Sequence, residues 1–399
     1  TALMNPQQLK DVAAAKIDES RELLLSVSSR LWQNPELALE ERMAHQLLTE
    51  TLESSGFSVT RHFVLDTGFK AEFGSAGAGR PHIAVMCEFD ALPGIGHACG
   101  HNLIAEVAVG AGLGIKAAME AGGLAGRVTV LGTPAEEAQG GKINMINAGF
   151  FKDVDVALMA HPDRMTTVHS AHLSLSSIEV IFTGKASHAA GSPWEGLNAL
   201  DAAVTAYQSV SNLRQQMRPD WRVHGIVKEG GQRPNIIPER AVLEYCTRAS
   251  TGGDSQLLLN KVKQCMHAAA MATGCECLIS ESEPEYKNVI PNRALAGAYS
   301  ANLRALGVEH TQLYPEPTGS TDMGNVSYEV PSIHPMFFIG GDAATHSAGF
   351  AVLAGAAEAQ RYVLEQAKAL AMTGIDVLTE PALVQRCWET FHEDLSIYG

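Results

Sequence analysis

The sequence has little charge for its size, and it lacks any long uninterrupted hydrophobic run. Only 18% of its 399 residues are charged, whereas 46% are hydrophobic. So little charge beside so much apolar composition excludes a disordered chain and a coiled coil. The length exceeds that of one ordinary core and therefore predicts two compact units.

Positive charge is in deficit, since 29 Lys and Arg stand against 44 Asp and Glu and give a net charge of -15. Such a chain repels phosphates, so neither nucleic acid nor an anionic membrane is expected as a partner. The most apolar stretch, Glu106–Gly126, is interrupted by Lys116 and Glu120 and favours a buried helix over a membrane span.

The sequence also shows no secretory-signal pattern and no cysteine spacing typical of a disulfide framework. The first twenty residues show no basic region followed by an apolar core, so no signal peptide is predicted. The seven cysteines have no even, regular spacing. These features favour reduced thiols and a cytoplasmic protein.

Short apolar segments alternate with Ala-rich helical stretches. The segments rich in branched residues are 82–89, 127–132, 155–160 and 334–340. Because they lack polar alternation, they are typical of strands covered on both faces. Helical periodicity over Ile17–Trp32 and 34–56 precedes them. The pattern predicts an α/β fold, with a mostly parallel sheet flanked by helices.

The middle of the chain follows another pattern. From residue 173 it reads strand, helix, strand, strand, helix, strand, with the helices over Asn198–Arg214 and Asp254–Ala272. That order is typical of an α+β unit of ferredoxin-like type. The predicted organisation is therefore a first segment 1–170, an inserted unit 171–285, and a second segment 286–399 of the same α/β domain.

Residues of metal-ligand type follow the ends of the predicted strands: Asp90, Cys99 and His101 after the first, Glu136 and Glu137 after the second, His161 after the third and His346 after the fourth. Taken singly, the cysteine could be a small buried apolar residue and the glutamate pair a helix N-terminus. Open α/β sheets, however, gather their sites at the carboxyl edge. The combination predicts a metal site there.

The types of donor suggest the chemistry. Thiolate with imidazole favours zinc, and imidazole with carboxylate also accepts manganese or cobalt. Amide hydrolysis needs a metal that lowers the pKa of water to about 7 and a base that takes its proton. If Glu137 binds metal, its neighbour Glu136 is close to that water and free to act as the base. A competing hypothesis makes Cys99 a thiol nucleophile.

Several stretches resemble the aminoacylase/carboxypeptidase/dipeptidase metallopeptidase family: NPELALEE, EFDALPGIGHACGHNLIAE, LGTPAEE, MAHP, GKASHAAGSPWEGLNALDA, RPNIIP and TGSTDMGNVS. They are most similar to its amidohydrolase subfamily, which includes auxin-conjugate, hippurate and aminobenzoyl-glutamate hydrolases. Within that subfamily, GHACGHNLIAE and GSTDMGNVS look most like the forms in β-alanyl-lysine dipeptidases. The resemblance extends over roughly residues 20–375.

The resemblance implies a site with two divalent ions. In it, Cys99 bridges the ions, His101 and His161 bind one of them, and Glu137 and His346 bind the other. Glu136 would be the general base, and Asp90 would orient a ligand from behind. His334 is the nearest competitor of His346, but it stands at the start of a predicted strand and is expected to be buried structure.

The resemblance also makes the inserted unit a lid and a dimerisation domain of a homodimer. His188 in GKASHAAGSP matches a lid histidine that stabilises the oxyanion, often from the partner subunit. Asn235 in RPNIIP and Arg248 in YCTRAS match positions that bind the carboxylate or carbonyl of the substrate. Ordinary alternatives are a solvated loop for His188, a turn for Asn235 and a structural ion pair for Arg248.

The functional hypothesis is hydrolysis of an amide bond in a dipeptide, with C-terminal lysine or ornithine favoured, or in an N-acyl amino acid. An aminobenzoyl-glutamate or other acyl-amino-acid hydrolase is the alternative, and it would need a cationic pocket. A metal-binding or ligand-binding protein without turnover is the alternative of another class, and the presence of Glu136 counts against it.

Overall fold

The computed structural model describes residues 4–75, 77, 79–314 and 319–398. It divides into two compact units. The first, here called the main unit, comprises the residues up to Ala171 and Val289–Ile397, and the inserted unit comprises His172–Asn288. The expected segments, 1–170, 171–285 and 286–399, divide the chain at nearly the same positions.

The main unit contains a six-stranded sheet in the order β1-β2-β4-β3-β5-β13. Its strands are β1 (Ser58–Arg61), β2 (Phe69–Gly74), β3 (His82–Cys87), β4 (Arg127–Gly132), β5 (Val156–Leu158) and β13 (Ser332–Ile333). The four from β4 to β13 run parallel, whereas β2 and β1 are antiparallel to their neighbours. Every residue of β3 is buried, as its uninterrupted apolar run predicts. The mostly parallel sheet is thus confirmed.

One predicted strand lies in another sheet. Of residues 334–340 only Met336–Phe338 (β14) is a strand, and it belongs to a small sheet in the order β12-β7-β14-β6. The partners are β12 (Thr311–Leu313), β7 (Thr167–His169) and β6 (His161–Asp163). The edge of the main sheet is instead the short β13. His334 and Pro335 separate it from β14, and Pro335 has no N–H for a sheet ladder. Strands this short leave no periodicity to detect.

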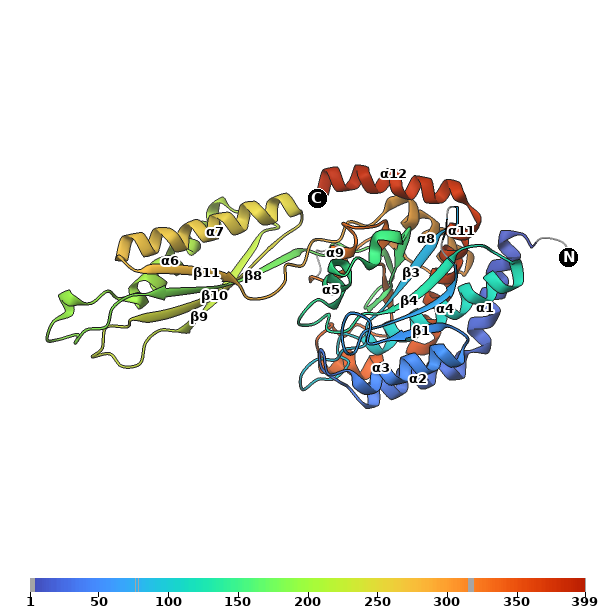
Figure 1. Ribbon diagram of the computed structural model, residues 1–399, viewed down its shortest axis with the longest axis horizontal. Helices are drawn as coiled ribbons and strands as arrows, with labels where there is room; N and C mark the ends of the chain where they lie inside the picture. The colour runs from blue at the N-terminus through green and yellow to red at the C-terminus, as the bar shows by residue number, and fades with distance from the viewer. Residues whose placement is uncertain (1–3, 76, 78, 315–318, 399) are drawn as a thin grey trace. The chain divides into compact units, whose positions relative to one another are not determined.

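The helix α4 (His101–Gly122) is the core helix of the main unit. It packs on β3 and β4 and contacts α1 (Pro6–Glu19), α2 (Arg21–Gln33) and α11 (Ala359–Thr379) (Figure 1). Its glycines permit this close packing, since a Cβ at Gly114 would lie 2.9 Å from the Ile17 side chain. The helix is long and apolar enough to cross a membrane, but 89% of its most apolar window is buried within the protein. It is therefore a core helix, as predicted.

The remaining α-helices of the main unit, among the described residues, are α3 (Arg42–Ser54), α5 (Gly141–Asn147), α8 (Arg293–Ala305), α9 (Met323–Val326), α10 (Ala348–Ala354) and α12 (Pro381–Tyr398). Two expectations near the N-terminus were wrong. The helix predicted over Ile17–Trp32 is divided at Ser20 between α1 and α2. The helix predicted over 34–56 begins only at Arg42, because the Glu36 carboxylate accepts the N–H groups of Met43 and Ala44 and so caps α3 there.

The inserted unit contains an antiparallel sheet in the order β11-β8-β10-β9. Its strands are β8 (Ser174–Thr183), β9 (Arg222–Glu229), β10 (Arg240–Ala249) and β11 (Glu276–Glu281). Helices α6 (Ala199–Asn212) and α7 (Gly252–Thr273) pack on each other and on one face of this sheet (Figure 1). Asn198 caps α6 by accepting two backbone N–H groups. The order of elements is the ferredoxin-like one predicted.

Candidate metal centre

The loop before α4 places two donor residues side by side. Gly100 separates Cys99 from His101, the first residue of α4, and has a left-handed φ of 78°. A Cβ at this glycine would lie 2.5 Å from Pro162, so the loop passes close to β6 only because the side chain is absent. Cys99 and His101 therefore face His161, which begins β6.

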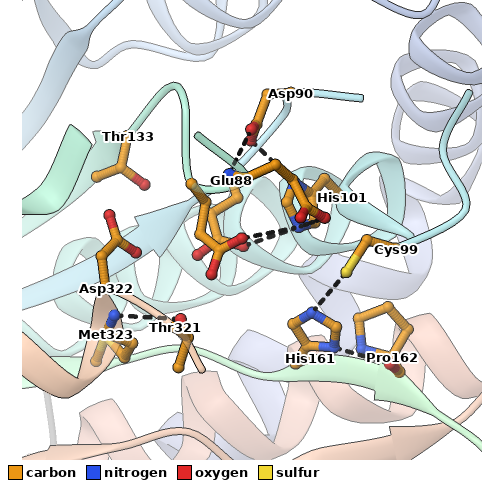
Figure 2. A network of polar contacts seen from close by, with 12 residues as sticks. Glu88, Asp90, Cys99, His101, Thr133, His161, Pro162, Thr321, Asp322 and Met323 are labelled. Atoms are coloured by element: carbon orange, nitrogen blue, oxygen red, sulfur yellow. Dashed lines mark hydrogen bonds and ion pairs between the residues drawn. The ribbon is translucent and has the colours of Figure 1, made fainter. Parts of the chain in front are cut away.

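The five predicted metal ligands lie together in two overlapping groups. Cys99, His101 and His161 form one, Cys99, Glu137 and His346 form the other, and within each group the donor atoms lie within 4.8 Å of one another. Cys99 Sγ is 3.5 Å from His161 Nε2 (Figure 2), and Glu137 Oε1 is 3.2 Å from His346 Nε2. A donor shared by two groups is the arrangement that two neighbouring ions require.

The unsatisfied atoms of this cluster also fit cations. His101 Nδ1 donates to Asp90 Oδ1 at 2.9 Å. Burial alone would lower the pKa of His101, but Asp90, Cys99 and Glu88 outweigh it and raise the pKa, so Nε2 also holds a proton unless a metal cation takes its place. That Nε2 faces Glu88 Oε2 at 3.4 Å, and both atoms are buried without a hydrogen-bond partner among the residues that the structure describes. Two acceptors facing each other in the interior repel unless a cation or a proton lies between them. Thiolate, imidazole and carboxylate donors together suit a divalent transition metal.

Asp90 orients both groups of donors. One carboxylate oxygen accepts from His101 Nδ1 (Figure 2), and the other accepts the backbone N–H of Glu137 at 3.0 Å. Burial by itself would raise the pKa of Asp90, but the adjacent His101 outweighs it and lowers the pKa. Asp90 is thus an ionised acceptor that contacts residues of both donor groups.

Glu136 and Glu137 are adjacent in the chain and titrate in opposite directions. Burial, followed by the charges of Glu88 and Glu137, raises the pKa of Glu136 well above its ordinary value. Burial also opposes ionisation of Glu137, but its bond to His346 outweighs this and lowers the pKa. A pair with separated pKa values can divide the work: one carboxyl carries protons and the other stays ionised as a ligand.

The sequence did not reveal a buried charged triad beside the donors. Glu88, Lys142 and Asp322 are all fully buried. Lys142 Nζ donates to Glu88 Oε1 and, at 2.6 Å, to Asp322 Oδ1. Burial alone would lower the pKa of Lys142, but Asp322 and Glu88 outweigh it and raise the pKa.

A signal existed for one member of that triad. Glu88 is the first charged residue of the apolar run 82–89, where an unpaired carboxylate would be costly. Lys142 and Asp322 are far apart in the chain, and no spacing rule links them.

His346 and His334 differ as expected. His346 has a left-handed φ of 61°, donates its backbone N–H to Ala98 O at 2.8 Å and turns its ring toward Glu137. His334 is buried, with its ring 5.5 Å from the ring of His161.

In the inserted unit, His188 and Asn235 lie on neighbouring loops. The backbone N–H of Ala189 donates to Asn235 O at 3.1 Å. His188 Nδ1 accepts the N–H groups of Ala190 and Gly191 at 3.2 and 3.0 Å, so the ring hydrogen resides on Nε2. The exposed His188 therefore presents an N–H donor to solvent.

Arg248 does not join them. It lies near the end of β10, opposite Leu175 of β8, whereas the two loops adjoin the Arg240 end of the same strand. Eight residues of strand correspond to about 26 Å. The structure thus brings together two of the three residues predicted in the inserted unit and separates the third from them.

Comparison with known proteins adds to this geometry. Residues 84–365 match Peptidase family M20/M25/M40. The chain is 49% identical to the Xaa-Arg dipeptidase of Mus musculus over 390 residues, covering 94% of this chain and 90% of the mouse protein. It is 33% identical over 314 residues to one of the two subunits of the p-aminobenzoyl-glutamate hydrolase of Escherichia coli K12, covering 73% and 64% of the two chains. A dinuclear metal-binding peptidase from Bacillus subtilis has the same fold, with a TM-score of 0.72 and 19% identity over 90% of this chain and 99% of the other.

Proposed function

Since the chain belongs to Peptidase family M20/M25/M40, we propose that it is a dinuclear metal-dependent dipeptidase that releases a C-terminal basic residue. The observation that carries the proposal is the pair of donor groups sharing Cys99, with Glu136 beside them. The near full-length likeness to the mouse Xaa-Arg dipeptidase supports arginine as the released residue, beside the lysine and ornithine predicted from sequence.

The residues divide into ligands and proton carriers. Cys99 would hold both ions, His101 and His161 one, and Glu137 and His346 the other. Bound ions would acidify water and polarise the amide carbonyl. Glu136 would accept the proton of the attacking water and deliver it to the leaving amine, a transfer that suits its raised pKa. Zinc is the proposed metal because a thiolate is among the donors, with manganese or cobalt as the alternatives.

For the inserted unit we propose oxyanion stabilisation and substrate binding. His188 would donate Nε2–H to the developing oxyanion, which is consistent with its fixed tautomer. Asn235 and Arg248 would bind the substrate carboxylate or carbonyl. Because Arg248 lies about 26 Å along β10 from the Arg240 end that adjoins the His188 loop, one inserted unit cannot readily supply both groups to a small dipeptide. A second copy of the chain could supply one of them.

The proposed homodimer would form along β9, the edge strand of the inserted sheet. Ile226 and Val227 on this strand are 59% and 45% exposed, and an apolar edge strand favours pairing with another strand. Light scattering of Ile226→Lys would show a monomer if the edge forms the dimer. Mixing Glu136→Gln with His188→Ala protein would restore activity only if His188 acts on the partner's centre.

The first test is metal content together with a substrate panel. The protein should bind about two ions per chain and hydrolyse Xaa-Arg and β-alanyl-lysine dipeptides faster than acyl-amino acids or aminobenzoyl-glutamate. A chelator should abolish the activity and added metal should restore it. Preference for the glutamate conjugate would favour the alternative substrate class, and metal binding without turnover would favour a ligand-binding protein.

The thiol hypothesis has its own test. Burial raises the pKa of the Cys99 thiol well above its ordinary value, which disfavours a free thiolate nucleophile. Activity that survives chelation and is lost on alkylation would nevertheless establish it.

A reducing, cytoplasmic location also remains a proposal. All seven cysteines are free, and oxidation of Cys99 would remove the shared donor. Fractionation of cells expressing the full-length protein would test it.

A further inference from the structure

The turn that carries Glu136 is held in an unfavourable backbone conformation. Ala135 immediately precedes Glu136, is fully buried and has a φ of 62°. The left-handed region is crowded for any residue with a Cβ, so a single alanine adopts it only where its surroundings impose it. Something must therefore hold this alanine in place.

Glu41 makes the contact that does so. Its Oε1 accepts the backbone N–H of Ala135 at 3.0 Å, and its Oε2 accepts the Thr67 hydroxyl at 2.8 Å. The Glu41 side chain is fully buried. Without it, the Ala135 N–H would be a buried donor with no acceptor, a costly arrangement that a relaxed turn would avoid.

The local fold leaves Glu41 available for this contact. It occupies the N-cap position of α3, where a carboxylate ordinarily accepts N–H groups of its own helix, yet its side chain makes no such bond. Glu36 caps α3 instead, through Met43 and Ala44. The Glu41 carboxyl is therefore turned away from its helix and toward the turn after β4.

Two carboxyl groups thus hold the residues on either side of Glu136. Glu41 binds the N–H of Ala135, and Asp90 binds the N–H of Glu137. Glu136 lies between the two fixed amides, so its direction depends on both contacts. We propose that Glu41 is a positioning residue, which acts through Ala135 to aim Glu136 and Glu137 at the metal centre. This inference rests on the proposed function, in which those glutamates are base and ligand.

The contact needs an acceptor oxygen at the right distance rather than a charge. Burial raises the pKa of Glu41 to about 7, so its carboxyl is partly protonated near neutral pH and can still accept from Ala135. Glutamine retains such an oxygen at the same distance. Aspartate retains the charge but is one methylene shorter and withdraws the oxygen.

The test compares Glu41→Gln, Glu41→Asp and Glu41→Ala with the wild-type protein. Wild-type turnover of an Xaa-Arg dipeptide is measured first. If the wild-type protein shows no turnover, the proposed function is refuted before any variant is assayed. With that activity present, Glu41→Gln should stay within a few-fold of wild type. Glu41→Asp and Glu41→Ala should lose about 100-fold in kcat with little change in KM.

A second readout does not depend on turnover. Titration of the metal-free variants with Co²⁺, followed by absorption, should show two ions bound, with about 10-fold to 100-fold weaker binding at one site in Glu41→Asp and Glu41→Ala. The weaker site would be the one that Glu137 shares. Full kcat together with unchanged Co²⁺ binding in Glu41→Asp would overturn the proposal, as would an impaired Glu41→Gln beside a normal Glu41→Asp.

Ala135→Gly provides the decisive combination, because glycine adopts a positive φ without a Cβ clash. Alone it should leave activity within a few-fold of wild type. Combined with Glu41→Asp it should recover at least about 10-fold of the lost kcat.

Glu36→Ala is the matched control: it loosens the same segment without touching the turn, so it should lower the melting temperature and leave kcat unchanged. Equal kcat losses in Glu36→Ala and Glu41→Asp, or no recovery with glycine, would reduce Glu41 to a structural role.

Discussion

The main unit and the inserted unit place their candidate functional groups in opposite settings. In the main unit the donors are mostly buried and held by other side chains, as Asp90 holds His101. In the inserted unit His188 and Asn235 are exposed, and backbone contacts hold their loops. The donor cluster is therefore organised by side-chain contacts within the folded main unit, whereas His188 and Asn235 present their side chains to solvent.

Each unit has a lysine that contacts two carboxylates, and the two lysines differ in their burial. Lys142 in the main unit lies between Glu88 and Asp322, and all three side chains are fully buried. Lys228 in the inserted unit lies between Glu179 and Glu244 at 2.8 and 3.1 Å, with half of its side chain exposed. Because water and salt screen only the second triad, burial rather than geometry should decide what each contributes.

The largest expected effect is on chemistry in the main unit. Glu136→Gln keeps the size of the side chain but removes the proton carrier, so kcat should fall by about 1,000-fold to 10,000-fold. Metal content and melting temperature should stay close to wild type, because the proposed ligands are intact. Steady-state kinetics with metal analysis would check this. Retained turnover would remove Glu136 from the mechanism and weaken the contrast between the two units.

Removing the buried lysine should have the next largest effect. Lys142→Met leaves the carboxylates of Glu88 and Asp322 buried without a counter-charge, which should cost about 3–5 kcal/mol in the free energy of unfolding. Urea unfolding monitored by circular dichroism would measure the loss. A variant as stable as wild type would show that the triad is dispensable for the fold.

The sequence allows prediction of residues that follow strand ends, but not of buried contacts between residues far apart in the chain. The clustering of Cys99, His101, Glu137 and His161 was predictable because all four follow strand ends, a local pattern that can be read along the chain. Lys142 and Asp322 are 180 positions apart and meet only in the folded core. The separation of Arg248 from His188 depends on the register of β10 against β8, which no sequence pattern specified.

The strands likewise fall into those long enough to predict from sequence and those too short. The strands β3 and β4 have six residues each and are mostly apolar, whereas β13 has two residues and β14 three. A run of two or three residues has no period, so the chain alone could not assign β14 to the small sheet.

A buried carboxyl in α4 gives an intermediate effect that depends on pH. Burial raises the pKa of Glu106 to about 7, from 4.5 for the ordinary group. As pH rises from about 4.5 to 7, the unfolded chain ionises this group while the folded chain retains the proton, so stability falls and then levels off. The shift corresponds to about 3 kcal/mol.

Glu106→Gln should abolish that loss, so that the variant gains stability over wild type between pH 5 and pH 8. Urea unfolding at both values would measure the difference. Glu120 lies exposed on the same helix beside Lys116, and Glu120→Gln should show no comparable pH-dependent gain. Parallel curves for wild type and Glu106→Gln would show that the folded protein ionises Glu106 as readily as the unfolded chain.

The smallest expected effect is at the exposed lysine. Lys228→Met removes two ion pairs, as Lys142→Met does. The carboxylates that it leaves, those of Glu179 and Glu244, remain accessible to water. We expect little or no change in the melting temperature, and any change should vanish in 1 M salt, where the screening length is about 3 Å. Thermal melts of both lysine variants at low and high salt would test this directly. If Lys228→Met destabilised the protein as much as Lys142→Met and did so in high salt, burial would not be what separates the two triads. Their common geometry, one ammonium between two carboxylates, would then be the stabilising element in both units.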